Sequence, residues 1–165
     1  MERNTKNILS RNHHTSISIV RKQSMNISAR NIFKGTITSV VKGAVNAEID
    51  LALADGTSIC SVITMGAVEK LGLKEGMDAY AIIKANSIIL GTNLHEAKIS
   101  ARNFMCGTVQ RVIDGPVSAE IDIEIGNGTL LSAVITHESA RKLALQEGSH
   151  ACAIFKASSV LIGVA

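Results

Sequence analysis

Aromatic residues and proline are nearly absent from this 165-residue sequence, which has no tryptophan, one tyrosine, three phenylalanines and one proline. A hydrophobic core must therefore be built from Ile, Val, Leu and Ala. Hydrophobic residues make up 46% of the chain, which is enough for packed domains and argues against general disorder. Surfaces that bind single-stranded nucleic acids use stacking aromatic side chains, so their scarcity weighs against that function.

The chain also lacks any apolar run approaching the roughly 18 residues that a membrane-spanning helix needs. Its first 24 residues are rich in Asn, Ser, Arg and His and lack the apolar stretch of a secretory signal. Three cysteines, Cys60, Cys106 and Cys152, form an odd number without metal-type spacing. We interpret them as reduced thiols, the usual state of cysteines inside cells. These absences predict a cytoplasmic protein without a membrane partner.

The formal charge of +3 is unevenly distributed along the chain. Residues 1–27 hold five basic residues and one acidic residue, a balance of +4, so the remainder carries about −1. The rest of the chain therefore offers no overall basic face to nucleic acid. Residues 1–24 have no apolar periodicity, which predicts a disordered N-terminal extension whose deletion leaves assembly and ion binding intact.

The sequence contains an internal duplication. A shift of 72 places aligns residues 28–93 with residues 100–165 without a gap, and 30 of the 66 aligned positions are identical. Such a repeat indicates two copies of one structural unit. The predicted organisation is an N-terminal extension (1–24), a first domain (25–93), a linker (94–98) and a second domain (99–165).

Each copy has the pattern of short β-strands separated by glycine turns. In the first copy, strands are expected over 33–41, 45–53, 57–63, 77–84 and 87–91. The hydrophobic period changes after Thr64, where a short helix ending near Gly72 is expected. Five strands and one short helix predict a mostly β protein of two tandem OB-like five-stranded β-barrels. A domain this small buries only about 60% of the surface that its unfolded chain exposes, so self-association is expected.

The sequence offers no catalytic constellation. None of His95, His137 and His150 has a histidine at the equivalent position of the other copy. Glu48 and Asp50 lie on one face of a strand and could form an acid/base pair, but a solvated strand face is the more common reason for such a pattern. No glycine-rich phosphate loop of the Walker or Rossmann type occurs. The sequence therefore predicts that the protein is not an enzyme.

Both copies instead keep a set of hydrogen-bond donors suited to an anion. Each of these side chains could be an ordinary surface charge or helix cap, but their joint retention favours an anion site. A threonine at the start of a helix can cap it while leaving N–H groups directed outward. The retained pairs are Ser28/Ser100, Arg30/Arg102, Thr64/Thr136 and Lys84/Lys156.

The shared segments resemble the Mop, or molbindin, domain. The resemblance rests on Ser-Ala-Arg-Asn before a Gly-Thr strand, on Val-Lys-Gly-Ala-Val-Asn-Ala-Glu-Ile, on Val-Ile-Thr and on Ile-Ile-Lys-Ala-Asn-Ser. It covers about residues 28–165 and implies a tandem cytoplasmic molybdate-binding protein with OB-like barrels. It further implies a homotrimer that holds molybdate or tungstate for storage and homeostasis, with sites between subunits.

By position, the resemblance assigns oxyanion binding to a Ser-x-Arg segment, a threonine after the third strand and a Lys-Ala-Ser segment of each copy. It implies no direct protein–metal ligands. The predicted oxyanion-binding residues are Ser28, Ala29, Arg30, Thr64, Lys84, Ala85, Ser100, Ala101, Arg102, Thr136, Ser139, Lys156, Ala157 and Ser158.

The two copies differ at some of these places, so their sites need not be equal. The first copy has Ala67 and Asn86 where the second has Ser139 and Ser158, and Asp114 replaces Lys42 beside a glycine turn. Two other functions stay open: an oxyanion-sensing module that acts on a separate transporter or regulator, and, less favoured, OB-type nucleic-acid binding.

Overall fold

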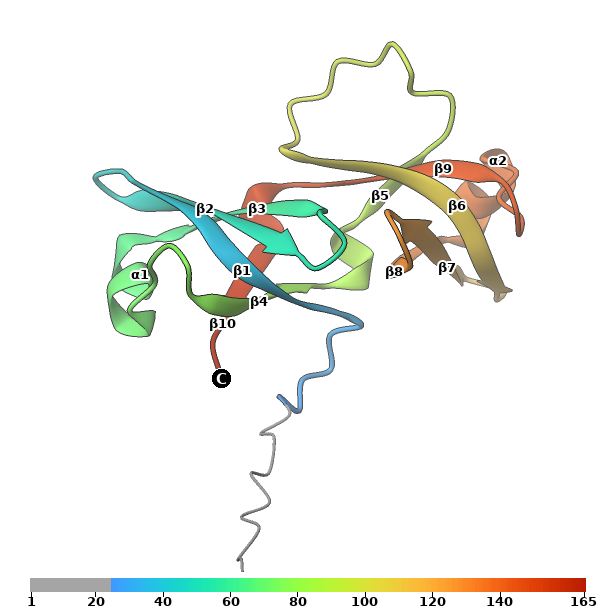
Figure 1. Cartoon of the computed structure of the whole chain (residues 1–165). Coiled ribbons are helices and arrows are strands. Elements are labelled where there is room, and N and C mark those ends of the chain that lie inside the picture. Colours follow the sequence, from blue (N-terminus) through green and yellow to red (C-terminus); the bar gives the residue numbers. More distant parts are fainter. Residues whose placement is uncertain (1–24) are drawn as a thin grey trace, which may run out of the picture.

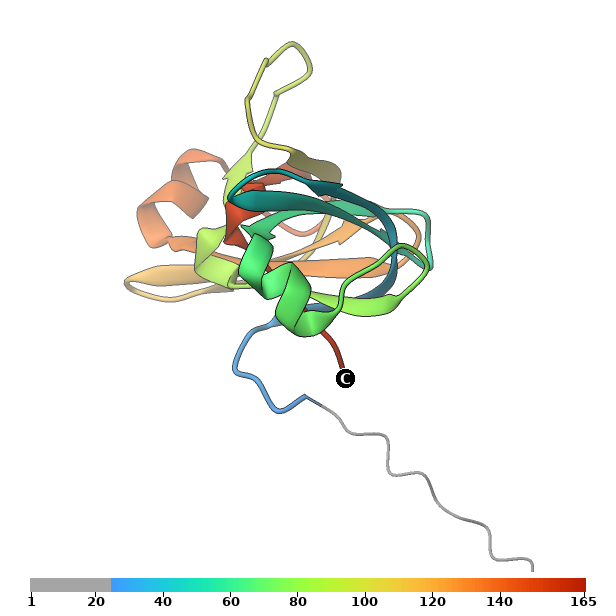
Figure 2. The same cartoon turned by 90° about the vertical axis from the view of Figure 1, so that its left-hand side faces the viewer.

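The computed structural model describes residues 25–165, and the predicted extension 1–24 lies outside the described part. Two curled β-sheets lie side by side, each with one short α-helix at its outer end (Figures 1 and 2). The strands of the first repeat are β1 (Asn31–Lys42), β2 (Asn46–Leu53), β3 (Ser58–Thr64), β4 (Asp78–Ile83) and β5 (Ile89–Gly91). Those of the second are β6 (Asn103–Asp114), β7 (Ser118–Ile125), β8 (Thr129–Thr136), β9 (His150–Phe155) and β10 (Val160–Gly163). The helices are α1 (Met65–Leu71), α2 (His137–Lys142) and the 3-10 turns η1 (Ala85–Ser87) and η2 (Ala157–Ser159).

The final strand of each repeat belongs to the sheet of the other repeat. The sheet orders are β10-β4-β1-β2-β3 and β5-β9-β6-β7-β8. In the first sheet Val160 of β10 pairs with Ile83, and in the second Ile89 of β5 pairs with Ile154. Figure 1 shows β10, in red, lying beside the green β4. The predicted mostly β fold with five-stranded OB-like sheets is confirmed, but the exchange of last strands was not predicted.

The core has the period-two pattern expected of half-buried strands. In β2 the buried residues alternate with the partly exposed Glu48 and Asp50. Strand β7 has the same alternation except at Asp122, which is buried. Gly35 and Gly107 allow β1 and β6 to approach their partners closely, because a Cβ at either would collide with a backbone carbonyl of the neighbouring strand. This close approach explains why both repeats keep a glycine there.

Both α-helices begin at the threonines predicted to cap them. The hydroxyl of Thr64 accepts a hydrogen bond from the backbone N–H of Ala67, and Thr136 does the same for Ser139. Helix α1 ends at Gly72, which has the left-handed conformation (φ 63°) that favours glycine. No helix among residues 25–165 is long and apolar enough to cross a membrane.

Two buried asparagines join the repeats. Asn31 accepts a hydrogen bond from the backbone N–H of Ser132 and donates one to its carbonyl, both at 2.8 Å. Asn103 makes the same pair of bonds with Cys60, also at 2.8 Å. Both asparagines are only 1% exposed. Each carboxamide thus acts as a strand-like partner for the edge strand of the other repeat.

The cysteines differ from the prediction. Cys106 and Cys152 are directly opposite each other on β6 and β9 and form a disulfide, whereas Cys60 is a buried free thiol. The prediction of reduced thiols is therefore wrong for this pair. The reason is the register between β6 and β9, which brings together residues 46 positions apart.

Candidate oxyanion site

Lys84 and Lys156, a lysine pair kept in both repeats, are exposed and stand directly before the 3-10 turns. Lys84 precedes η1 and Lys156 precedes η2, and the carbonyl of each accepts a hydrogen bond from an N–H of its turn at 2.9 Å. The alanine that follows each lysine is buried, which fixes the turn against the sheet. The sequence Lys-Ala therefore anchors a rigid turn and leaves the ammonium group at the surface.

A pocket of about 570 Å³ brings together the two donor segments of the second repeat, and we call it the Lys156 pocket. Ser100, Ala101 and Arg102 approach from the segment before β6. Lys156, Ala157 and Ser158 approach from the end of β9 and η2. Six of the predicted oxyanion-binding residues thus share one cavity, together with Val62 of β3 and Ser87 of η1 from the first repeat.

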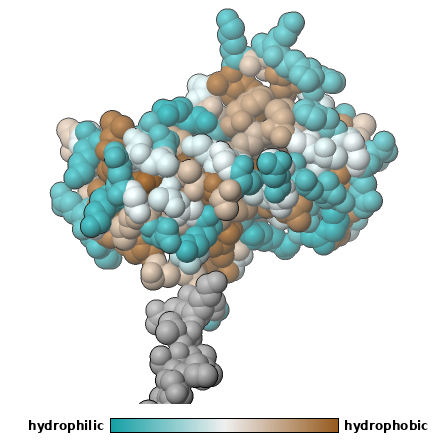
Figure 3. Space-filling view, viewed as in Figure 1, coloured by the Kyte–Doolittle hydropathy of each residue, from teal (hydrophilic) through white to brown (hydrophobic). Residues whose placement is uncertain are grey.

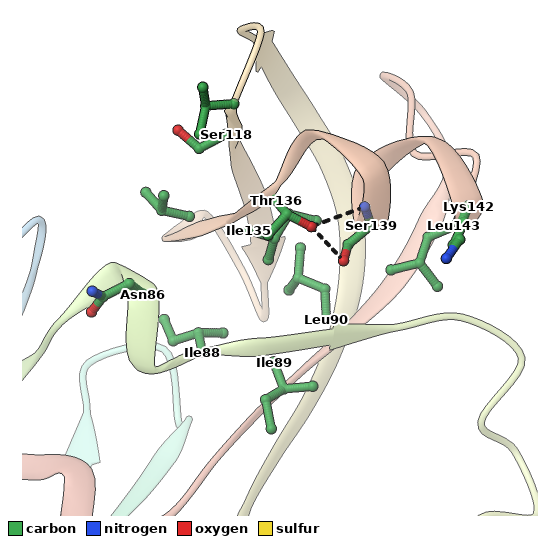
Figure 4. A pocket seen from close by; sticks show the side chains of 12 residues that line it. Asn86, Ile88, Ile89, Leu90, Ser118, Ile135, Thr136, Ser139, Lys142 and Leu143 are labelled. Atoms are coloured by element: carbon green, nitrogen blue, oxygen red, sulfur yellow. Dashed lines mark hydrogen bonds between the residues drawn. The ribbon is translucent and has the colours of Figure 1, made fainter.

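A second pocket, of about 610 Å³, lies at the start of α2 and is called the Thr136 pocket (Figure 4). Thr136 and Ser139 line it, and their hydroxyls are 2.8 Å apart. On the opposite side Asn86 projects from η1 of the first repeat, beside the apolar residues Ile88, Ile89 and Leu90 (Figure 4). The pocket therefore combines the helix start of one repeat with the Lys-Ala-Asn turn of the other.

Each repeat packs its 3-10 turn on a strand of the other repeat. Turn η1 packs on β8, which ends at Thr136, and turn η2 packs on β3, which ends at Thr64. Within one chain the predicted donors do not all converge on one point. Neither of the two pockets is lined by the predicted residues Ser28, Ala29, Arg30, Thr64, Lys84 and Ala85.

Both predicted anion-binding arginines form ion pairs with the other repeat. Arg102 donates to both carboxylate oxygens of Glu48, at 2.6 and 2.8 Å, and Arg30 pairs with Glu120. The hydrogen bond to Glu48 is the main cause that raises the pKa of Arg102. Glu48 is therefore not merely part of a solvated strand face, because it orients the Arg102 guanidinium. A bidentate pair leaves other guanidinium N–H groups directed away from the carboxylate.

The surroundings of the two arginines differ in charge. Arg111 bonds to Asp122 at 2.6 Å and to Glu120 at 3.3 Å, so two arginines face two carboxylates near Arg30. The first repeat has Ser39 at the position of Arg111, so Arg102 alone faces Glu48 and Asp50. The group around Arg30 is neutral, whereas the group around Arg102 has a net charge of −1.

Asp114 also changes the surface near the Thr136 pocket. Its carboxylate lies 2.6 Å from Nδ1 of His137, the first residue of α2. In the first repeat the equivalent residues are Lys42 and Met65. The expectation that Asp114 weakens anion binding near the β6–β7 turn stays a prediction. The His137 side chain is a partner for the Asp114 carboxylate.

Among the described residues, Glu48, Asp50 and Cys60 are the one group of three His, Cys, Asp or Glu side chains whose possible metal-binding atoms all lie within 4.8 Å of one another. Burial, followed by the charge of Glu48, raises the pKa of the Cys60 thiol to about 11. The thiol is therefore protonated at neutral pH. A protonated thiol is a poor metal ligand, because metals bind the thiolate.

Sequence reasoning missed the residues that position the donors. Asn31 and Asn103 join the repeats, and Glu48 and Glu120 hold the arginines. These asparagines and glutamates occur at equivalent positions of both copies, and this retention is the sequence signal that could have revealed them. Their partners could not be read from the sequence, because each bond joins different repeats.

The TOBE domain model matches residues 27–90 and 99–162. Molybdenum-pterin-binding protein MopA of Rhodobacter capsulatus is 44% identical over 140 residues, which cover 85% of this chain and 53% of that protein. Molybdenum transport protein ModE of Azotobacter vinelandii is 36% identical over 146 residues, 88% of this chain and 54% of that protein. The chain thus spans about half the length of these two relatives.

A solved structure has the same fold over both repeats. It is described as the cytoplasmic molybdate-binding protein ModG in a form with molybdate bound. It is 39% identical, with a TM-score of 0.83, and the match covers 86% of this chain and all of that one. Together with the matches to relatives described as molybdenum-pterin-binding, this confirms the resemblance to tandem Mop-domain proteins. The chain therefore belongs to the TOBE domain family and carries the domain twice.

Proposed function

We propose that this protein binds molybdate or tungstate in the cytoplasm, for storage and homeostasis of the ion. The observation that carries the proposal is the Lys156 pocket, where Ser100, Arg102, Lys156 and Ser158 gather around one cavity. The molybdate-bound structure of ModG, which matches this chain over both repeats, supports the choice of ligand. The proposal assigns binding and no catalytic step.

The chemistry of these donors suits a tetrahedral dianion. Molybdate and tungstate are fully deprotonated at neutral pH, so a site for them needs donors and no obligatory acceptors. Arginine, lysine, serine and backbone N–H groups provide donors. Each hydrogen bond to a charged group is worth about 1.5–3 kcal/mol, and a micromolar site needs about 8 kcal/mol. A handful of such bonds is sufficient.

We further propose that the sites are completed between subunits of a homotrimer. Exposed apolar residues occur at equivalent positions of both repeats: Val41 and Ile113, Val45 and Val117, Ile89 and Leu161. Their exposure ranges from 50% to 78%, and their recurrence at equivalent places of both repeats supports a contact surface for another subunit. Figure 3 shows brown, apolar residues reaching the surface where the β1–β2 hairpin turns. Ile89 lines both pockets, so a subunit that covered it would also close the two cavities.

Calorimetric titration with molybdate tests the role of the lysines. We expect the double variant Lys84→Ala, Lys156→Ala to bind at least about tenfold more weakly, because each lost charge-assisted bond is worth about 1.5–3 kcal/mol. The matched control is Lys70→Ala, Lys74→Ala, which removes two other exposed lysines. Equal affinity in the lysine variant and the wild type, with unchanged stoichiometry, would place the sites elsewhere.

A second candidate function is oxyanion sensing on behalf of a separate transporter or regulator. The similarity to a molybdenum transport protein over both repeats favours it. The two functions differ in what happens when the gene is deleted. Storage predicts unchanged expression of molybdate transport genes at equal intracellular molybdate, whereas sensing predicts that their expression shifts.

A further inference from the structure

Four side chains of the types that bind soft or borderline metals are neighbours at the outer face of the second sheet, three of them on its strands and one on the linker. Cys106 and Cys152 are cross-strand partners on β6 and β9, with Cα atoms 3.9 Å apart. His150 is two residues before Cys152, so both side chains point to the same face of β9. His95, from the linker, stacks on His150 with ring centroids 6.2 Å apart.

The linker forms the outer wall of this group. A pocket of about 350 Å³ lies between linker residues 94–99 and the sheet, and His95, Cys106 and Cys152 all line it. In Figure 1 the linker rises as a loop above β6 and β9, and Figure 3 shows brown, apolar residues at its base. Lys98 also lines the pocket. Its long side chain can keep the ammonium group in water.

The first repeat has ordinary surface chemistry at the same positions. Lys34, Tyr80 and Asp78 occupy the places of Cys106, Cys152 and His150, and Lys34 forms an ion pair with Asp78 at 2.8 Å. The fold therefore does not require cysteine or histidine at these positions. The second repeat replaces the ion pair and the tyrosine with two cysteines, which form the disulfide, and with a histidine, which the disulfide does not require.

The two imidazoles lie close enough to reach a single ion after a small movement. A Zn–N bond is about 2.0–2.1 Å, so two imidazoles on one tetrahedral zinc ion have ring centroids roughly 5 Å apart. The stacked rings of His95 and His150 have centroids 6.2 Å apart, so the two side chains must move closer and turn to share an ion. Both rings are exposed, and rotation about χ2 of histidine meets only broad minima, so their nitrogens can turn toward a common point.

We propose that the reduced thiols of Cys106 and Cys152, together with the imidazoles of His150 and His95, bind one divalent cation of the zinc class under the linker. Two thiolates and two imidazoles form the S₂N₂ set that zinc binds tetrahedrally. Binding of the cation releases the two thiol protons. The site is separate from the donors of the Lys156 pocket, so this inference does not depend on the proposed oxyanion function.

The disulfide is the metal-free, oxidised form of the same site. A small dithiol reduces it by thiol–disulfide exchange: the two protein sulfurs gain two electrons and two protons, and the dithiol becomes a cyclic disulfide. A small disulfide reverses the change by the same exchange: it takes up the two electrons and two protons to become two thiols, and the protein loses both sulfur ligands. In the oxidised structure, Glu48, Asp50 and Cys60 are the one group of described residues with three such ligand atoms within 4.8 Å of one another, so the proposed site forms only after the disulfide is reduced and the histidine rings turn.

Cobalt binding to the full chain tests the proposal. The protein is reduced with a phosphine, kept free of oxygen and titrated with Co²⁺, whose bonds to thiolate produce an intense near-ultraviolet charge-transfer band. We expect one Co²⁺ per chain and this band in the reduced protein, and no band in the oxidised protein. The double variant Cys106→Ser, Cys152→Ser should lack the band.

Two further variants distinguish the proposed cation site from the Cys60 group, and they test it without removing the disulfide. His95→Ala lies in the exposed linker, and we expect it to weaken cobalt binding by more than about tenfold, since even partners of metal ligands change affinity by that factor. Cys60→Ser should keep the band, and the cysteine pair variant should keep molybdate binding. The proposal is overturned if the reduced wild type has no band, if the band survives loss of Cys106 and Cys152, if Cys60→Ser abolishes it, or if His95→Ala leaves affinity unchanged.

Discussion

At the scale of single residues, a few polar side chains carry the contact between the repeats. Asn31 and Asn103 satisfy backbone groups of the opposite edge strand from fully buried positions. Glu48 orients Arg102 across the same junction, which connects the fold to the proposed site. Because buried polar groups are costly when unpaired, these asparagines are more sensitive to substitution than their size suggests.

We expect Asn103→Ala to lower the free energy of unfolding by about 1–3 kcal/mol for each backbone group of Cys60 that loses its partner. Urea denaturation measures the change. Asn127→Ala, in the exposed β7–β8 turn, is the control and should alter stability by less than about 0.5 kcal/mol. Equal stability of the two variants would mean that the asparagine bonds do not hold the repeats together.

Asp55 makes the junction sensitive to acid. The hydroxyl of Thr129, in the other repeat, donates to its carboxylate at 2.5 Å and is the main cause that lowers the pKa of Asp55, followed by the backbone N–H of Thr57. A carboxyl with a lowered pKa stabilises the fold above its unfolded pKa, and this contribution is lost as pH falls through the folded value.

We therefore expect Asp55→Asn to reduce the loss of stability that the protein undergoes as pH falls below about 4. The difference should be about 1 kcal/mol, because Asp55 is partly exposed. Urea midpoints measured between pH 6 and pH 3 provide the test, and Thr129→Val should produce a smaller change in the same direction. Parallel curves for all three proteins would refute this role for Asp55.

At the scale of elements, local sequence signals located most strands and both helices. The pattern around Thr64 predicted a helix ending near Gly72, and α1 spans Met65–Leu71 with Gly72 as its C-cap. The last strand, expected over 87–91, begins only at Ile89 because residues 85–87 form the turn η1. Its transfer to the other sheet could not be predicted, because both repeats present nearly the same strand and pairing within or between repeats satisfies the same pattern.

The exchange of last strands predicts how an isolated first repeat assembles. A fragment of residues 25–93 has β5 but no β10 to complete its sheet. Because β5 and β10 occupy equivalent places, two fragments can exchange their last strands. We expect the fragment to fold as a dimer or a higher assembly, measured by light scattering and circular dichroism. A folded monomer would show that the exchange is not needed to complete the sheet.

At the scale of the whole molecule, the duplication produces two similar but unequal halves. The sequence predicted fourteen residues of the candidate site, and the structure brings six of them to the Lys156 pocket. The sequence could not predict the charge environment of these donors, since Arg30 reaches Glu120 and its partner Arg111 only through an ion pair that crosses the repeats. Sites that include Arg30 are therefore expected to bind an anion more tightly than those that include Arg102.

Native mass spectrometry of the full chain, recorded with and without molybdate, tests the central claim most directly, because it reports subunit number and bound ions together. We predict an assembly of three chains of 17.4 kDa each that gains discrete molybdate masses. The lysine variant Lys84→Ala, Lys156→Ala should keep the trimer and lose bound ions. A stable monomer that acquires no molybdate would contradict both the assembly and the proposed function.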